Sequence, residues 1–353
     1  MIRSYRFGLA VAVATLVIAS LNAGPASTPY QRLALPSLSG PGPGAVAFGI
    51  NDRGQIVGYS VFGRRMDDEG GEEDVVHAVL WQQGVITDLG TLAGGDSVAT
   101  AINNAGQIVG FSDGRAVMWD RGTIVDLGTL APDVVYGSSW SYAKAINNRG
   151  QIVGEGNAAG NEQCTHAILW DRGAIVDLGT LNGGACEWPD HDSSIALAIN
   201  DRGQVAGRSA APGGFDHAVV WDRGRMVDLG PAGGGHSSEA TGINNRGEVI
   251  GTSGYAALWR HGRITQLEVP LGGGRLWPIA INERGQVIGQ QLPLYGNENS
   301  TGPRPLLWEG GTLSMALGTR GYPLAINARG DVVGYDFDGP SRPRDLSAYL
   351  WTR

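Results

Sequence analysis

The segment Ala-Ile-Asn-Asn-Ala-Gly-Gln-Ile-Val-Gly, residues 101–110, joins two short apolar runs through a turn that contains asparagine and glycine. Its central string, Ile-Asn-x-x-Gly, occurs seven times in the 353-residue chain. The seven copies begin at Ile50, Ile102, Ile146, Ile199, Ile243, Ile281 and Ile326. Successive asparagines are 38 to 53 residues apart, with a mean of 46 (276 residues over six intervals). Self-similarity at such a period is typical of propellers and solenoids.

A second marker, a tryptophan that ends a short apolar run, also occurs once in each repeat. These tryptophans are Trp81, Trp119, Trp170, Trp221, Trp259, Trp308 and Trp351. In the second repeat, short runs of small and apolar residues cover 98–103, 107–112, 116–119 and 123–127. Turns that contain glycine separate these runs, which is the pattern of antiparallel strands joined by hairpins. Each repeat therefore predicts four strands.

Four antiparallel strands repeated about every 46 residues match one blade of a β-propeller. The last repeat stops at Arg353 after its third strand, while residues 35–38 match the end of a fourth strand at residues 89–92. We therefore predict an all-β, seven-bladed propeller in one domain, residues 27–353, with an N-terminal strand that completes the last blade. The repeated tryptophans are expected to fill the space between blades. An open β-solenoid is the competing fold, but a solenoid needs no borrowed strand.

Residues 1–26 have the pattern of a signal peptide. Arg3 and Arg6 precede the apolar run Phe7–Leu21, which is too short to span a bilayer, and small residues follow it. An uncleaved membrane anchor is the alternative. We predict export to the periplasm or beyond the cell, and no membrane span in the mature chain. The net charge is −8 without any basic cluster, which argues against nucleic-acid binding.

The repeat motifs carry a family resemblance. His-Ala-Val-Leu-Trp (77–81), Thr-Asp-Leu-Gly-Thr-Leu (87–92) and the segment at 101–110 together resemble the HAF-repeat family of bacterial repeat proteins, from about residue 33 to the end. The resemblance implies an extracellular repeat protein and no assigned reaction. The chain departs from the family motif, because no copy has phenylalanine in the third place. The motif histidine is present only at His77, His166 and His217.

The connections between strands differ greatly in how much they vary. The turns between the first and second strands, and between the third and fourth, barely change from repeat to repeat. The connections after the second and fourth strands vary in length, as 61–76 and 182–194 illustrate. In a four-stranded meander these two sets emerge on the same face, which we call the variable face. Variable loops on a rigid scaffold are the usual carriers of binding or catalysis.

Aromatic residues outside the repeat pattern are the candidate ligand-binding residues. The chain has ten tryptophans, so three remain after the repeated ones are assigned, and all three are predicted in connections between a fourth strand and the next first strand. Three tyrosines are predicted on the same variable face, one of them at the end of the connection 131–142. The six residues are Trp140, Trp188, Trp277, Tyr136, Tyr142 and Tyr295. Such aromatics could stack on sugar rings or anchor a protein partner. The alternative, equally open for each tryptophan, is that the ring folds back and plugs its own loop.

Cys164 and Cys186 are the only cysteines, and both belong to connections of the variable face. In an exported chain two such cysteines favour a disulfide, which would close a loop of about 23 residues. Two free thiols are the alternative.

The sequence offers little evidence of catalysis. Residues 110–114, Gly-Phe-Ser-Asp-Gly, match the nucleophile-elbow string, but the match is the end of a repeat strand and we interpret it as a coincidence. His191 and His236 have no ligand spacing that predicts a zinc site. We therefore expect no metal, no cofactor and no catalytic residue.

The function predicted from these observations is non-catalytic binding of a protein or polysaccharide through the variable face, by a monomer. A carbohydrate-active enzyme or polysaccharide-binding propeller is the first alternative, and it rests on the loop aromatics and nearby acids. A structural component of the cell surface is the second.

Overall fold

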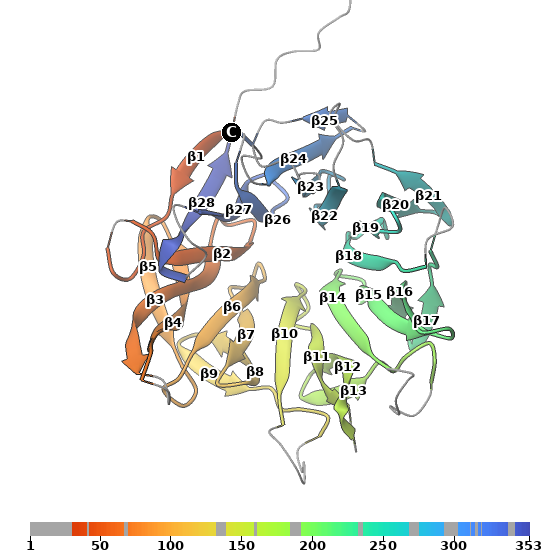
Figure 1. The fold of residues 1–353 in the computed structure, drawn as a ribbon, viewed down its shortest axis with the longest axis horizontal. Coiled ribbons are helices and arrows are strands. Elements are labelled where there is room, and N and C mark those ends of the chain that lie inside the picture. The colour runs from red at the N-terminus through yellow and green to blue at the C-terminus, as the bar shows by residue number, and fades with distance from the viewer. Residues whose placement is uncertain are drawn as a thin grey trace, which may run out of the picture.

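The structure is a computed structural model of the whole chain. It describes residues 30–40, 42–66, 70–131, 139–158, 161–183, 192–231, 236–267, 275–292, 303–310, 312–314, 317–318, 320–337 and 343–353. Within these ranges the chain forms seven antiparallel sheets of four strands each, arranged in a ring (Figure 1). The predicted seven-bladed propeller is therefore confirmed. The predicted signal peptide, residues 1–26, lies outside the described residues.

Six blades are built from four consecutive strands. Blade 1 comprises β2 (Ala45–Ile50), β3 (Ile56–Met66), β4 (Glu72–Gln82) and β5 (Val85–Gly90). Blade 2 comprises β6 (Ser97–Ile102), β7 (Ile108–Ser112), β8 (Arg115–Asp120) and β9 (Thr123–Asp126). Blade 3 comprises β10 (Ser141–Ile146), β11 (Ile152–Ala158), β12 (Asn161–Asp171) and β13 (Ala174–Asp177). Blade 4 comprises β14 (Ser194–Ile199), β15 (Val205–Ala211), β16 (Phe215–Asp222) and β17 (Arg225–Asp228). Blade 5 comprises β18 (Glu239–Ile243), β19 (Val249–Thr252), β20 (Ala256–Arg260) and β21 (Arg263–Gln266). Blade 6 comprises β22 (Arg275–Ile281), β23 (Val287–Leu292), β24 (Arg304–Glu309) and β25 (Thr312–Ser314).

Blade 7 joins the two ends of the chain. It comprises β26 (Tyr322–Ile326), β27 (Val332–Phe337), β28 (Leu346–Thr352) and β1 (Gln31–Ala34), with a short 3₁₀ helix, Pro343–Asp345, before β28. The strand β1 pairs antiparallel with β28, so the N-terminal segment supplies the outermost strand of the last blade. The Tyr30 hydroxyl donates a hydrogen bond to the Gly330 carbonyl (2.8 Å), and the Arg32 guanidinium lies 3.5 Å from the centre of the Tyr349 ring. The predicted ring closure is confirmed, with the strand placed just before residues 35–38.

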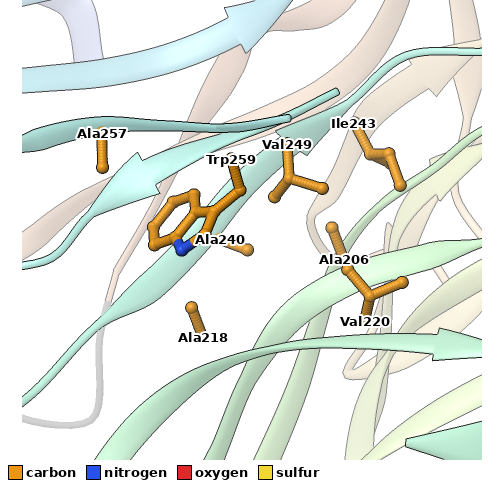
Figure 2. Close-up of a cluster of buried hydrophobic side chains, with 8 residues drawn as sticks. All are labelled: Ala206, Ala218, Val220, Ala240, Ile243, Val249, Ala257 and Trp259. Carbon is orange, nitrogen blue, oxygen red and sulfur yellow. The ribbon is translucent and has the colours of Figure 1, made fainter. Parts of the chain in front are cut away.

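The hydrophobic core consists of seven clusters, each shared by two successive blades. Figure 2 shows one of them: Trp259 of blade 5 lies close to Ala240 of its own blade and above Ala218 of blade 4. Small residues on one blade leave room for the tryptophan of the next. All seven repeated tryptophans are buried, with exposed fractions of 1–8%. The expectation that they fill the space between blades is confirmed.

A ring of asparagines joins the blades at the Ile-Asn-x-x-Gly turns. In each turn the asparagine Oδ1 accepts the backbone N–H groups two and four residues later, and Nδ2 donates to the carbonyl of the equivalent asparagine in the next blade. The seven links run from Asn51 to Asn103, Asn147, Asn200, Asn244, Asn282, Asn327 and back to Asn51, at 2.9–3.2 Å. All seven side chains are buried. The repeated motif therefore closes a continuous hydrogen-bonded circle.

Every first strand has a register shift at the same place, and the second strand has a glycine beside it. In blade 2 the shift falls between Ala99 and Ala101, opposite Gly110. A Cβ on Gly110 would lie 1.9 Å from the Val98 carbonyl oxygen, so the two backbones approach more closely than any side chain allows. The glycine of the Ile-Val-Gly string is thus required by this approach and not by a turn.

The turn glycines have a different requirement, a left-handed backbone. Gly106 has φ = 89°, and a Cβ there would meet only the Gln55 side chain, at 3.9 Å. We expect Gly106→Val to lower the free energy of unfolding by about 1–2 kcal/mol through backbone strain. Equilibrium urea unfolding would measure the change. The control is Ala105→Val in the same turn, which adds a branched side chain at an exposed residue; equal losses in the two variants would contradict strain as the cause.

Candidate functional site

One pair of residues in each blade is set apart by its position and its variability. It lies where the first and second strands meet the variable face, with the first-strand residue directly opposite the second-strand residue. We call these the rim pairs. They are Val46/Tyr59, Val98/Phe111, Tyr142/Glu155, Ile195/Arg208, Glu239/Thr252, Trp277/Gln290 and Tyr322/Tyr335, in blades 1 to 7. The first strands are the innermost in Figure 1, so the rim pairs surround the axis of the ring.

A nearly constant framework holds the rim pairs. The glycine before the second-strand member lets the first and second strands approach closely at the register shift. In four blades a serine comes directly after the second-strand member. The Ser112 side chain is fully buried, and its Oγ accepts the Leu92 backbone N–H at 2.8 Å from the preceding loop. Ser60 and Ser209 accept the equivalent bonds from Leu38 and Leu181. Ser112 therefore ties the end of β7 to the preceding loop.

The rim divides by chemistry into an aromatic part and a charged part. Its aromatic members are Tyr59, Phe111, Tyr142, Trp277, Tyr322 and Tyr335, and its charged members are Glu155, Arg208 and Glu239. The Tyr322 and Tyr335 rings stack on each other with centroids 4.7 Å apart. Burial raises the pKa of Tyr59 to about 12.

Blades 2 and 3 together carry a cluster of three aromatic rings, Phe111, Trp140 and Tyr142, which we call the aromatic platform. The Tyr142 ring lies 4.8 Å from that of Phe111, edge-on, and 5.1 Å from that of Trp140. Asn157 fixes the Trp140 backbone, because its Oδ1 accepts the Trp140 N–H at 2.7 Å. All three rings are half-buried. The platform is therefore positioned by its own blades and keeps part of its surface accessible.

Blades 4 and 5 contribute a charged group. The Arg208 guanidinium forms an ion pair with Asp216 and lies 3.3 Å (Nε–Oε1) from Glu239. Burial raises the pKa of Glu239; Arg208 opposes the rise and Asp216 adds to it. One cation thus contacts two carboxylates.

A cavity of about 690 Å³ opens beside this charged group, between blades 4, 5 and 6. Its lining includes Arg208, Asp216, Glu239, Tyr255, Gln266 and Trp277. A volume of this size suits a small ligand or one part of a larger one. Aromatic and hydrogen-bonding side chains therefore meet in one hollow of the rim. We call it the rim cavity.

The structure describes three of the six predicted aromatic residues. Trp140 and Tyr142 come together in the aromatic platform, whereas Trp277 lines the rim cavity. Trp277 and Tyr142 belong to strands β22 and β10, although both were predicted in connections. Trp188, Tyr136 and Tyr295 lie outside the described residues.

The predicted disulfide stays a prediction. Cys164 lies in β12 and is 5% exposed, whereas Cys186 lies outside the described residues.

The other rim residues, including Arg208, Glu239 and Tyr335, were not predicted from the sequence. Part of this set could have been found from the strings Gly-Tyr-Ser (58–60), Gly-Phe-Ser (110–112) and Gly-Arg-Ser (207–209). Their middle residue varies between constant neighbours, which indicates a position that is free to change on a constant backbone.

The motif histidines have a local structural role. Each Nδ1 lies within hydrogen-bond distance of an aspartate on the fourth strand of its own blade, and the other oxygen of that aspartate accepts the N–H of a turn glycine. The pairs are His77–Asp88, His166–Asp177 and His217–Asp228, at 2.8, 2.8 and 2.9 Å. The bond to Asp177 raises the pKa of His166. Among the described residues, no group of three or more His, Cys, Asp or Glu could hold a metal ion.

Comparisons with known proteins agree with the fold. Residues 43–174 match the sequence family described as Protein of unknown function (DUF3466). No curated protein matches the chain. Where the structure describes the chain, no helix is long and apolar enough to cross a membrane.

Among solved structures, a puromycin-hydrolyzing peptidase from Mycobacterium tuberculosis is 16% identical with a TM-score of 0.50, covering 83% of this chain and 50% of the peptidase. Virginiamycin B lyase from Staphylococcus aureus is 13% identical (TM-score 0.47; 92% of this chain and 99% of the lyase). The β-propeller domain of the Trilobed protease from Pyrococcus furiosus is 12% identical (TM-score 0.47; 87% and 93%). At these identities the likeness concerns the fold alone. The chain is thus a β-propeller repeat protein.

Proposed function

We propose that this chain is an exported bacterial propeller of the HAF-repeat kind that binds a neutral carbohydrate in the rim cavity without chemistry. The observation that carries the proposal is the meeting of Trp277, Tyr255 and the Arg208–Asp216–Glu239 group in one hollow. The apparent signal peptide and the resemblance of the repeats support export.

The chemistry of the cavity favours a sugar. An aromatic face complements the apolar face of a sugar ring, and charged hydrogen-bonding groups serve its hydroxyls. The lining of the cavity contains two arginines and two acidic residues, so their formal charges balance. These residues are Arg208, Arg275, Asp216 and Glu239. The chain carries a net charge of −8, which disfavours an anionic ligand. These charges therefore favour a neutral ligand that is rich in hydroxyl groups.

Calorimetric titration of the purified protein with a panel of neutral glycans tests the proposal. We expect saturable binding to at least one glycan, and a loss of about tenfold or more in affinity on Trp277→Ala, because the aromatic wall is removed. The matched control is Trp277→Phe, which keeps an aromatic face and should retain most of the affinity. The absence of binding to every glycan, or equal affinity in Trp277→Ala, would contradict a carbohydrate site in the rim cavity.

A second function, glycoside hydrolysis, is favoured by one specific observation. Asp216 and Glu239 share Arg208, and Glu239 has the raised pKa that a general acid needs. Release of reducing ends by the protein, abolished by Glu239→Gln with binding intact, would establish turnover and overturn the non-catalytic proposal.

A further inference from the structure

The rim cavity and the aromatic platform lie along one arc of the ring. Their first strands, β10, β14, β18 and β22, belong to four successive blades and follow one another around the axis in Figure 1. The rim pairs of these blades include Tyr142, Arg208, Glu239 and Trp277, of which Arg208 is a second-strand member and the others are first-strand members. Aromatic surface therefore lies at both ends of the arc, and hydrogen-bonding charges lie between.

The middle of the arc is continuous from one blade to the next. Arg208 of blade 4 contacts Glu239 of blade 5, and both line the cavity that reaches Trp277 of blade 6. On the other side, Glu155 of blade 3 lies opposite Tyr142 and forms an ion pair with Lys144 at 2.8 Å. Each blade between the two aromatic ends thus offers donors and acceptors on the same face.

We infer that the site takes an extended neutral polysaccharide, which lies along the rim from blade 6 to blade 3 and uses the aromatic platform as a second subsite. This inference rests on the proposed function, because it extends the ligand of the rim cavity. Face-to-face sheets are about 10 Å apart, so an arc across four blades is longer than a single sugar ring. A polymer can occupy the cavity and the platform at the same time.

A protein partner fits this arc less well than a polysaccharide does. The centre of a protein–protein interface is depleted of charged residues. Here the centre of the arc is the charged part, since Arg208, Asp216 and Glu239 of blades 4 and 5 lie between the aromatic ends. Sugar hydroxyls hydrogen-bond well to such groups.

Chain length provides the test. Cello-, manno-, xylo- and chito-oligosaccharides, each as disaccharide and hexasaccharide, are titrated into the protein by calorimetry. We expect the hexasaccharide of the preferred series to bind about tenfold or more tightly than the disaccharide. Tyr142→Ala should remove about tenfold of the hexasaccharide affinity and leave the disaccharide affinity unchanged, because only the longer chain reaches the platform. Trp277→Ala should weaken both.

The matched control is Tyr322→Ala, which removes a tyrosine at the equivalent position of blade 7, beyond the arc; it should leave both affinities unchanged. Trp140→Ala serves as a second platform variant, and thermal melting confirms that each variant is folded. Equal affinity of the wild-type protein for short and long chains overturns the second subsite and leaves the proposed function standing. A length effect that survives both platform variants also overturns it. Failure of every oligosaccharide to bind overturns the proposed carbohydrate ligand, and the second subsite with it.

Discussion

We expect Gly110→Ala to lower the free energy of unfolding by about 3–5 kcal/mol, a large part of the stability of a typical domain. The added Cβ would lie 1.9 Å from the Val98 carbonyl oxygen and 3.0 Å from the Ala99 Cα. Both contacts are with backbone, so no side-chain rotation can relieve them. Relief would require β6 and β7 to separate at the register shift, which would break hydrogen bonds within blade 2.

Equilibrium unfolding in urea, followed by tryptophan fluorescence, measures this loss. The control is Gly63→Ala, since a Cβ at Gly63 has no neighbour within 4 Å and its φ lies outside the left-handed region. That variant should be neutral, or more stable by a few tenths of a kcal/mol, because alanine restricts the unfolded chain. A Gly110→Ala protein that unfolds at the wild-type urea concentration would show that the two strands can part without cost.

The same glycine explains how function can vary on a constant scaffold. The carbonyl that approaches Gly110 belongs to Val98, a rim residue, and the residue after Gly110 is its rim partner Phe111. Equivalent contacts of 1.9 Å occur at Gly58, Gly154, Gly207, Gly251 and Gly334. The framework therefore fixes the backbone of each rim pair and leaves its side chains free to differ.

The fold was predictable because its information is local and repeated. The Asn-x-x-Gly turns and the closing tryptophans recur in every blade, so period and strand count can be read along the chain. Ring closure was predictable from the missing fourth strand near Arg353 and the matching segment at residues 35–38.

The rim pairs were not predictable in the same way. The two members of a pair, such as Tyr142 and Glu155, stand on the two strands of one hairpin and become neighbours only through strand register. A register shift lies between each first-strand member and the asparagine turn. The alternation of apolar and polar residues along the strand therefore does not predict on which face of the blade a residue lies. Selecting aromatic residues outside the repeat pattern found Trp140 and Trp277 but not Arg208 or Glu239, because a single charged residue in a strand is not distinguishable in the sequence from an ordinary solvent-exposed residue.

We expect Asn147→Asp to have the second large effect: it should lower the free energy of unfolding by about 3–5 kcal/mol at neutral pH. The Asn147 Oδ1 accepts two backbone N–H groups at 3.0 Å, and Nδ2 donates to the Gln151 Oε1 (2.9 Å) and to the Asn200 carbonyl (3.0 Å). Aspartate has the same shape, so the first two bonds survive. The substitution replaces Nδ2 with an oxygen that faces the Gln151 Oε1 and the Asn200 carbonyl, both of which are acceptors. It also places a charge on a residue that is only 4% exposed.

The pH dependence identifies the cause. Burial against two acceptors disfavours the charged form, so the folded-state pKa of the introduced carboxyl should lie above its ordinary value of about 3.9. A carboxyl with a raised folded pKa destabilises most when it is ionised. The deficit relative to wild type should therefore shrink as the pH falls through the folded pKa, where the protonated acid can again donate one hydrogen bond. Urea unfolding of both proteins at pH 7 and pH 5 measures this difference.

The neighbouring residue provides the control for charge alone. Asn148 is exposed, and the equivalent position holds aspartate in blades 1 and 4, as Asp52 and Asp201. Asn148→Asp adds the same charge to the same turn and breaks no link of the asparagine ring. It loses only the partly exposed bond from Asn148 Nδ2 to the Asp201 carboxylate (3.0 Å), so its cost should be about 1–2 kcal/mol, below that of Asn147→Asp. Equal losses in the two variants would mean that charge in the turn, and not the ring, determines stability. A loss that occurs only in Asn147→Asp and becomes smaller at low pH would mean that the Asn147 amide donor stabilises the ring. Without that donor, blades 3 and 4 lose the asparagine-to-carbonyl hydrogen bond that joins every other pair of neighbouring blades.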